Sequence, residues 1–208
     1  YDYGPNENKT QYPKHLPISD KGWEYISNFA KNGGKVVLFG IAPSSRTIGN
    51  VTLPSLKWDT GYDVCYLSSD IPKKSDSFYP GHNYVLYSSF LGGQPGVFDG
   101  WDSKMGITLP YSKRTPNNFS SHRHWPADKK QGVVQPGAIQ KENILWFLVP
   151  LVKQYWLRDD DNHRDMLMGI LDQFVPNQLV IASDYPASIE INLTYQQLEK
   201  RYMLHVIN

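Results

Sequence analysis

The stretch DKGWEYISNFAKNGGKVVLFG, residues 20–40, decides the expected fold class. Ser19 or Asp20 offers an N-cap, and apolar side chains then recur at helical spacing. Two glycines, residues 33–34, end this helix. Residues 35–40 follow at once as a short apolar run bounded by glycine, which is the form of a buried parallel strand. A helix, a Gly-Gly turn and a buried strand make half of a βαβ unit, so the sequence predicts an α/β fold.

Later parts of the chain support the same interpretation. The composition predicts further strands at residues 62–68, 83–88, 144–149 and 179–183. Three acidic residues, Asp159, Asp160 and Asp161, precede a second helix. The apolar face of that helix consists of Met166, Leu167, Ile170, Leu171 and Phe174. We therefore expect a mostly parallel sheet with flanking helices over residues 19–182.

Two segments show little regular pattern. Residues 1–18 contain Pro5, Pro13 and Pro17, which bar a regular helix, so we expect an extended lead-in. Residues 92–137 are rich in glycine and proline, and we expect a long irregular excursion there. A loop of this length in a compact domain is either functional or only partly ordered.

The end of the chain has a different pattern. In residues 188–195, apolar Ile189, Ile191 and Leu193 alternate with Glu190, Asn192 and Thr194. This period of two is typical of a strand with one wet face. Residues 202–207 form a second such run, so the sequence predicts an antiparallel hairpin. We place a domain boundary near residue 182 and assign residues 183–208 to the second domain.

Charge and composition argue against two kinds of partner. The net charge is +1, and basic residues form only short pairs such as Lys73–Lys74 and Lys129–Lys130, so we expect no nucleic-acid partner. No apolar run approaches the ~20 residues that span a bilayer, so we expect no membrane partner. The chain opens on polar residues without a signal peptide, and we expect it to be a piece of a longer protein.

Three segments resemble the C-terminal region of glycoside hydrolases related to the beta-galactosidase trimerisation domain. Residues 23–38 are similar to that family's helix, Gly-Gly turn and strand. Residues 143–174, which include Tyr155 and Trp156, look like its late strand, aromatic loop and closing helix. Residues 185–193 and 201–208, with the ending Leu-His-Val-Ile-Asn, resemble the first hairpin of the β-sandwich that follows in that family. Together the segments cover less than half of the 208 residues.

This resemblance implies a flavodoxin-like fold similar to class I glutamine amidotransferases, with the hairpin as the start of a β-sandwich. It also implies that the catalytic barrel lies before residue 1 and is absent from this chain. We therefore expect a non-catalytic accessory or oligomerisation domain of a secreted glycoside hydrolase, without a cofactor. Its expected partners are a catalytic glycosidase domain or subunit and further copies of itself.

The single cysteine, Cys65, is the one candidate for amidotransferase chemistry. A working nucleophile needs a sharp strand-to-helix turn, flanking glycines and a nearby histidine. Cys65 instead lies inside an expected strand, Tyr-Asp-Val-Cys-Tyr-Leu, without flanking glycines. We interpret it as a buried structural residue.

Aromatic and polar residues leave two alternatives open. Trp101, Trp125, Tyr155 and Trp156 are candidate stacking surfaces for a carbohydrate-binding module. The pair His122 and His124 is a weak candidate for a metal site in a small hydrolase, with Asp128 as the nearest carboxylate. Solvated or packed loop histidines are the simpler interpretation. The turn at residues 98–102 and the acidic run at residues 159–161 are likewise interpreted as structural. For glycosidase chemistry, nothing in the sequence pairs the carboxylates Asp99, Asp102, Glu142 and Asp159.

Overall fold

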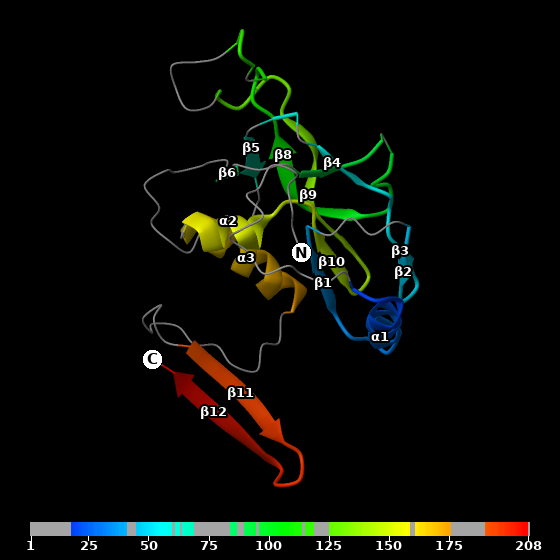
Figure 1. Cartoon of the computed structure of the whole chain (residues 1–208). Helices are drawn as coiled ribbons and strands as arrows, with labels where there is room; N and C mark the ends of the chain where they lie inside the picture. Colours follow the sequence, from blue (N-terminus) through cyan, green and yellow to red (C-terminus); the bar gives the residue numbers. More distant parts are fainter. Residues whose placement is uncertain are drawn as a thin grey trace. The chain divides into compact units, whose positions relative to one another are not determined.

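The computed structural model describes residues 18–40, 45–59, 61–62, 64–68, 84–86, 90–94, 96–113, 115–118, 125–158, 161–175 and 190–207. The chain divides into two units, Tyr1–Phe174 and Val175–Asn208, and each is described by itself. In chain order the first unit contains α1 (Asp20–Lys31), β1 (Val36–Phe39), β2 (Thr47–Ile48), β3 (Val51–Thr52), β4 (Lys57–Asp59), β5 (Cys65–Ser68), β6 (Tyr84–Leu86), β7 (Phe90–Gly92), β8 (Asp102–Thr108), β9 (Val133–Lys141), β10 (Ile144–Phe147), α2 (Leu151–Arg158) and α3 (Asp161–Phe174) (Figure 1). The second unit contains β11 (Glu190–Gln196) and β12 (Arg201–Ile207).

The first unit is built on a curled, mixed sheet of six strands in the order β1-β10-β9-β8-β5-β6. Only the β1–β10 pair is parallel, and the other pairs are antiparallel. Two short pairs, β2–β3 and β4–β7, form separate antiparallel ladders. The prediction of a mostly parallel, flavodoxin-like sheet with flanking helices is therefore wrong, because the described structure is mostly β.

The physical reason for this correction lies in how β1 finds its partner. The local signals in residues 20–40 were interpreted correctly, since α1 is followed by β1 and β1 pairs in parallel with β10. A βαβ unit would reach the parallel neighbour through a crossover helix. Here the chain reaches β10 through β8 and β9, each antiparallel to the next strand. A local sequence pattern specifies a helix or a strand but not its distant partner. The prediction therefore assumed that the whole sheet is parallel, although only one pair of its described strands is.

Residues 92–137, which were expected to be irregular, contribute β8 and the first part of β9. Their pairing contains register shifts between Ser103 and Met105 and again around Gly106, so two-residue periodicity is interrupted. A Cβ added to Gly106 would lie 2.8 Å from Cγ2 of Val133. Gly106 therefore lies where side chains of the neighbouring strands pack closely against the backbone of β8.

The ends of α1 follow the local signals closely. Ser19 is the N-cap, and its Oγ accepts a hydrogen bond from the Gly22 amide at 3.1 Å. At the other end Gly33 has φ +84°, a left-handed conformation that favours glycine. The side chain of Asn143, in the β9–β10 turn, donates to the carbonyls of Ala30 and Gly34. This side chain joins the turn before β1 to the turn before its parallel partner β10.

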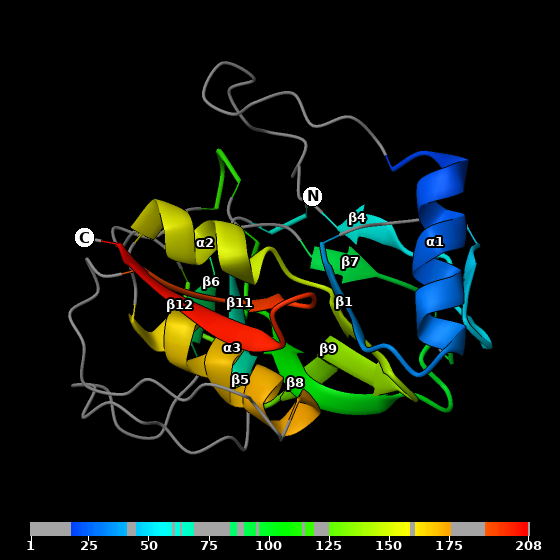
Figure 2. The same cartoon turned by 90° about the horizontal axis from the view of Figure 1, so that it is seen from below.

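The sheet separates two apolar clusters. Residues of β10 point alternately to each side: Leu145 and Phe147 join the cluster under α3, and Ile144 and Trp146 join the cluster under α1. All four side chains of this strand are fully buried. Figures 1 and 2 show α1 on one side of the sheet and α2 and α3 on the other. None of the described helices is long and apolar enough to span a membrane.

The second unit is the expected antiparallel hairpin. Glu190 pairs with Ile207 and Gln196 with Arg201, with five further pairs between them in unbroken register. The expected lead-in at residues 1–18, apart from Ile18, lies outside the described residues, as do the expected strand at 179–183 and the expected boundary near residue 182. The domain boundaries therefore remain predictions.

Candidate functional site

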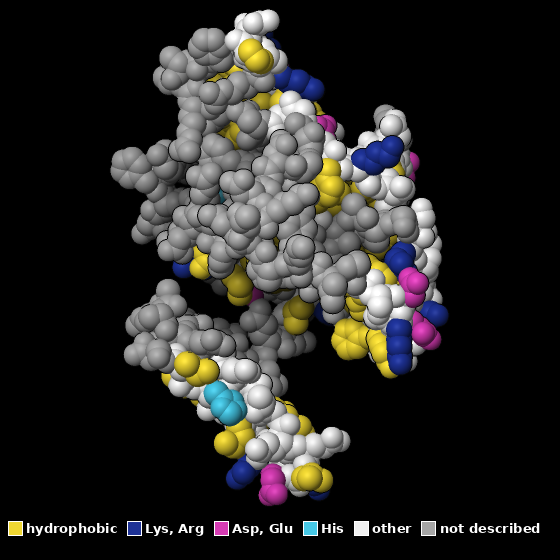
Figure 3. Space-filling model, in the orientation of Figure 1, with side chains coloured by type: hydrophobic (Ala, Val, Ile, Leu, Met, Phe, Trp, Pro, Cys, Tyr) yellow, Lys and Arg dark blue, Asp and Glu magenta, His cyan; other side chains and the backbone are white. Residues whose placement is uncertain are grey.

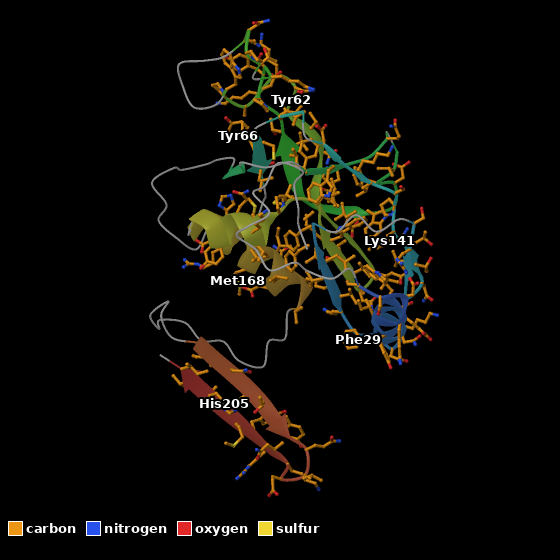
Figure 4. The ribbon with its side chains drawn as sticks, in the orientation of Figure 1. Phe29, Tyr62, Tyr66, Lys141, Met168 and His205 are labelled. Carbon is orange, nitrogen blue, oxygen red and sulfur yellow. The ribbon has the colours of Figure 1, made fainter. Side chains whose placement is uncertain are left out.

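An aromatic cluster lies where β5 begins and β8 ends, and we define it as Tyr62, Tyr66, Tyr111, Lys113 and Trp125. Two loop segments, residues 109–111 and 126–128, pair with each other beside the cluster. The Tyr111 amide donates to the Pro126 carbonyl at 3.1 Å, and Pro110 pairs with Ala127. The Tyr66 hydroxyl donates to the Trp125 carbonyl at 2.5 Å. Figure 4 shows Tyr62 and Tyr66 in the same region of the first unit, above β5 and β8.

Tyr111 and Trp125 form the centre of the aromatic cluster. Their ring centroids are 5.0 Å apart and the rings meet edge to face at 64°. Tyr111 is 53% exposed, whereas Trp125 is half-buried. The Trp125 Nε1 is buried and has no hydrogen-bond partner within the described part of the chain. The half-buried indole of Trp125 therefore packs against one side of the exposed Tyr111 ring.

Lys113 and Tyr62 add a charged group to the aromatic cluster. The Lys113 Nζ lies 4.6 Å from the centroid of the Tyr62 ring, within the range of a cation–π contact. Close by, Asp59 Oδ1 accepts a hydrogen bond from the Gly61 amide at 2.8 Å, which shapes the turn before Tyr62. The cluster thus contains one exposed ring, Tyr111, and an exposed cation, Lys113, which lies over the half-buried Tyr62 ring. This combination suits a ligand with both an apolar face and hydroxyl groups.

The structure describes the side chains of three of the four sequence-predicted aromatic residues, and these three lie in different parts of the first unit. Trp101 packs against the apolar cluster under α1, edge to face with Trp146 at 6.4 Å, and the Lys141 Nζ lies 5.9 Å from its ring centroid. Tyr155 is half-buried on α2, and the side chain of Trp156, on the same helix, lies outside the described residues. Of the three described side chains, only that of Trp125 belongs to the aromatic cluster.

The sequence interpretation missed Tyr62, Tyr66, Tyr111 and Lys113. Tyr111 and Trp125 meet only because residues 109–111 pair with residues 126–128 across a long connection. That pairing has no short-range sequence signal. The turn expected at residues 98–102 is present: the Trp101 amide donates to the Phe98 carbonyl at 3.0 Å.

The proposed metal-binding loop can be tested only in part. His122 and His124 lie outside the described residues. The nearby carboxylate of Asp128 accepts hydrogen bonds from the amides of Lys130 and Gln131 at 3.0 and 3.2 Å, so it closes a turn. Within the described residues, no group of three or more His, Cys, Asp or Glu side chains could hold a metal ion.

Cys65 is the buried structural residue that the sequence indicated. Its side chain is fully buried on β5 among apolar neighbours. Burial, and to a lesser extent the charge of Asp59, raises the pKa of the Cys65 thiol to about 12. Near neutral pH the sulfur is therefore a protonated thiol, whereas nucleophilic chemistry needs the thiolate.

Comparison with known proteins gives a similarity of fold. No family model and no curated protein matches the chain. Among solved structures, the chain is similar to a bacterial fucosidase. That structure is alpha-L-fucosidase isoenzyme 2 from Paenibacillus thiaminolyticus, with a TM-score of 0.68 and 19% identity over 94% of this chain. The chain spans 29% of the length of the fucosidase chain. At this identity the similarity shows the fold alone.

Proposed function

We propose that this chain is a non-catalytic accessory domain of a glycoside hydrolase, which packs against a catalytic barrel and takes part in oligomerisation. One observation carries the proposal: the structural similarity covers 94% of this chain but only 29% of the fucosidase chain. A fold that corresponds to under a third of a glycosidase is of the size expected for one domain of it.

The chemistry of Cys65 supports a non-catalytic role for this chain. It is the only cysteine in the chain, it is fully buried, and its raised pKa keeps the sulfur protonated near neutral pH. A glutaminase would need the opposite, an accessible thiolate beside a base. The helix and strand at residues 20–39 therefore serve the packing of the first unit.

The test of this proposal is an activity assay on the 208-residue chain. We expect no release of 4-nitrophenol from aryl α-L-fucosides, β-galactosides or β-glucosides above the rate without protein. Turnover that scales with the concentration of the chain and is lost on its unfolding would overturn the proposal. Binding of the chain to a separately produced catalytic barrel of its own longer protein, measured by calorimetry, is the expected positive result.

A second candidate function is carbohydrate binding at the aromatic cluster. The observation that favours it is the Tyr111 ring, which is 53% exposed and held edge to face by Trp125. The Tyr111 ring provides a stacking surface, and the Lys113 ammonium, which lies over the Tyr62 ring of the same cluster, provides a hydrogen-bond donor for a sugar.

Isothermal titration with oligosaccharides tests this second function. We expect Tyr111→Ala to weaken binding by about two- to tenfold, because stacking on an aromatic ring contributes about 0.5–1.5 kcal/mol. Tyr25→Ala is the matched control: Tyr25 is 64% exposed on α1 and has its own lysine, Lys21, 5.9 Å from its ring centroid. Equal weakening by both substitutions, or no binding by the unmodified chain, would exclude the aromatic cluster as the site.

A further inference from the structure

The β11–β12 hairpin has one face made entirely of apolar and aromatic side chains. In an antiparallel ladder, directly opposed residues place their side chains on the same face. The observed register therefore gathers three pairs on one face, which we call the apolar hairpin face: Ile191 with Val206, Leu193 with Leu204, and Tyr195 with Tyr202. Figure 3 shows apolar side chains (yellow) on the surface of the hairpin.

The other face of the hairpin is mostly polar. Thr194 Oγ1 and His205 Nε2 lie 3.2 Å apart there, and Arg201 Nε donates to Gln196 Oε1 at 2.7 Å. His205 is labelled on β12 in Figure 4. The hairpin is thus amphipathic, with a wet face that suits solvent and an apolar face that needs a cover.

Within the described residues of the second unit, no element covers the apolar hairpin face. Exposed fractions are 52% for Tyr195, 58% for Tyr202, 57% for Leu204 and 61% for Val206. Within the described residues the two strands form a sheet of their own. A two-stranded hairpin is at best marginally stable in water, and it needs packing on its hydrophobic face to persist.

The shape of the apolar hairpin face indicates what kind of surface could pack against it. The face tapers, because the two tyrosine rings, 4.8 Å apart, lie at the turn end and Ile191 and Val206 lie at the open end. Two such faces packed in opposite directions place each bulky end over a small end and keep the layer between them at uniform thickness. The central pair, Leu193 and Leu204, then lies at the two-fold axis.

We propose that the apolar hairpin face packs against the same face of a second copy of this chain. The arrangement is an isologous, two-fold contact between two hairpins stacked face to face at about 10 Å. This inference names the interface for the oligomerisation role proposed above, and it rests on that role.

The area of the face is sufficient for such a contact. Taking about 200 Å² as the full area of a large side chain, the four exposed residues leave on the order of 450 Å² accessible. The partly exposed Ile191 and Leu193 bring this to about 500 Å² in one copy. Two copies then bury about 1,000 Å², the lower limit for a specific interface, so we expect a dimer that dissociates in the micromolar range.

Light scattering after size exclusion tests the proposal on the whole chain. The unmodified protein at about 100 μM should have a mass of roughly 48 kDa, twice the 23.8 kDa of one chain. Leu204→Lys places a charge at the centre of the apolar hairpin face and should give a monomer at the same concentration. His205→Lys adds the same charge one residue along β12 on the wet face, and it should leave the dimer intact. The thermal transition of the first unit serves as the folding control for both variants.

A cross-linking experiment tests the orientation. Cys65 is fully buried, so only an introduced thiol should react in the folded chain. With a bis-maleimide cross-linker of about 10 Å reach, Leu204→Cys should form covalent dimers across the two-fold axis, whereas His205→Cys, on the outer faces, should stay largely monomeric. An unmodified chain that is monomeric at 100 μM, a dimer that survives Leu204→Lys, or equal cross-linking of both cysteine variants overturns the proposal. The activity assay on aryl glycosides is independent of these results, so a monomeric but inactive chain would overturn this interface and leave the accessory role standing.

Discussion

Removal of the Asn143 side-chain amide should destabilise the first unit more than any other single loss of a hydrogen-bonding side chain described above. Its Nδ2 donates to two carbonyls, those of Ala30 and Gly34, at the junction between α1 and β1. In Asn143→Ala both bonds are lost, and the Ala30 carbonyl keeps only its bond from the Gly33 amide, at 3.0 Å. The backbone carbonyl of residue 143 still accepts from Val36, so the main-chain ladder is preserved.

The magnitude follows from the number and burial of these bonds. A hydrogen bond contributes about 0.5–1.5 kcal/mol net, and a buried acceptor left without a partner costs about 1–3 kcal/mol. The two bonds are part-buried, so we expect Asn143→Ala to lower the free energy of unfolding by about 2 kcal/mol. For a unit of this size that corresponds to a fall in Tm of about 4–8 °C. Urea unfolding followed by tryptophan fluorescence measures it, because Trp146 is fully buried beside this junction on β10.

Asn118 provides the matched control for Asn143. Its Nδ2 also donates two hydrogen bonds, to Ser112 Oγ and to the Lys113 carbonyl, but at an exposed site. Asn118→Ala should therefore change the free energy of unfolding by less than about 0.5 kcal/mol, since water replaces the lost bonds. The reasoning is refuted if the two alanine variants are equally stable, because the position of Asn143 between two turns would then have no energetic consequence.

Three further predictions concern separate parts of the first unit. Ser19→Ala removes the N-cap hydrogen bond from the Gly22 amide and should lower the free energy of unfolding by about 1 kcal/mol, which thermal denaturation can measure. Ser19→Asp keeps a side-chain acceptor and should leave the free energy of unfolding unchanged. Gly137→Ala should cost about 1–3 kcal/mol by overpacking, because the added Cβ would lie 3.1 Å from Ile107 Cγ1; no change in the urea midpoint would contradict the tight packing of β8 on β9. The pKa of the Cys65 thiol is raised from 9.0 to about 12 on folding, so its stabilising effect is complete below pH 9 and is lost as the pH rises towards 12. The difference in unfolding free energy between the unmodified chain and Cys65→Ala should therefore shrink above pH 9, by up to about 1.4 kcal/mol per pH unit. A difference that stays constant from pH 8 to pH 10.5 would contradict the raised pKa of the thiol.

The elements that could be predicted from the sequence are those whose signals are local. The N-cap at Ser19 and the glycine at position 33 mark the ends of α1 within a few residues of one another in the chain. The apolar face of α3 and the period-two pattern of β11 are likewise contained in single short segments. In each case the physical cause, a capping bond or a hydrophobic face, acts within the segment itself.

The sheet topology and the aromatic cluster could not be predicted, because their causes are distant in the chain. The partner of β1 is more than a hundred residues away, and the bulges of β8 interrupt the pattern that would have identified it as a strand. Tyr111 meets Trp125 only through the pairing of two loop segments. Trp101 was a reasonable candidate by residue type, but its ring packs edge to face against Trp146 at the apolar cluster under α1. Residue type identifies aromatic side chains, whereas packing decides which of them remain exposed.

The strand β10 explains how an α/β pattern and a mostly antiparallel sheet coexist in one unit. It is parallel to β1 on one side and antiparallel to β9 on the other, and its four residues are buried on both faces. The sequence of a strand that is buried on both faces is a continuous apolar run, whether its neighbours are parallel or antiparallel. The run at residues 144–149 therefore predicts burial correctly and carries no information on strand direction. Direction is set by the connections, and here the short β9–β10 turn that contains Asn143 imposes an antiparallel pair beside the parallel one.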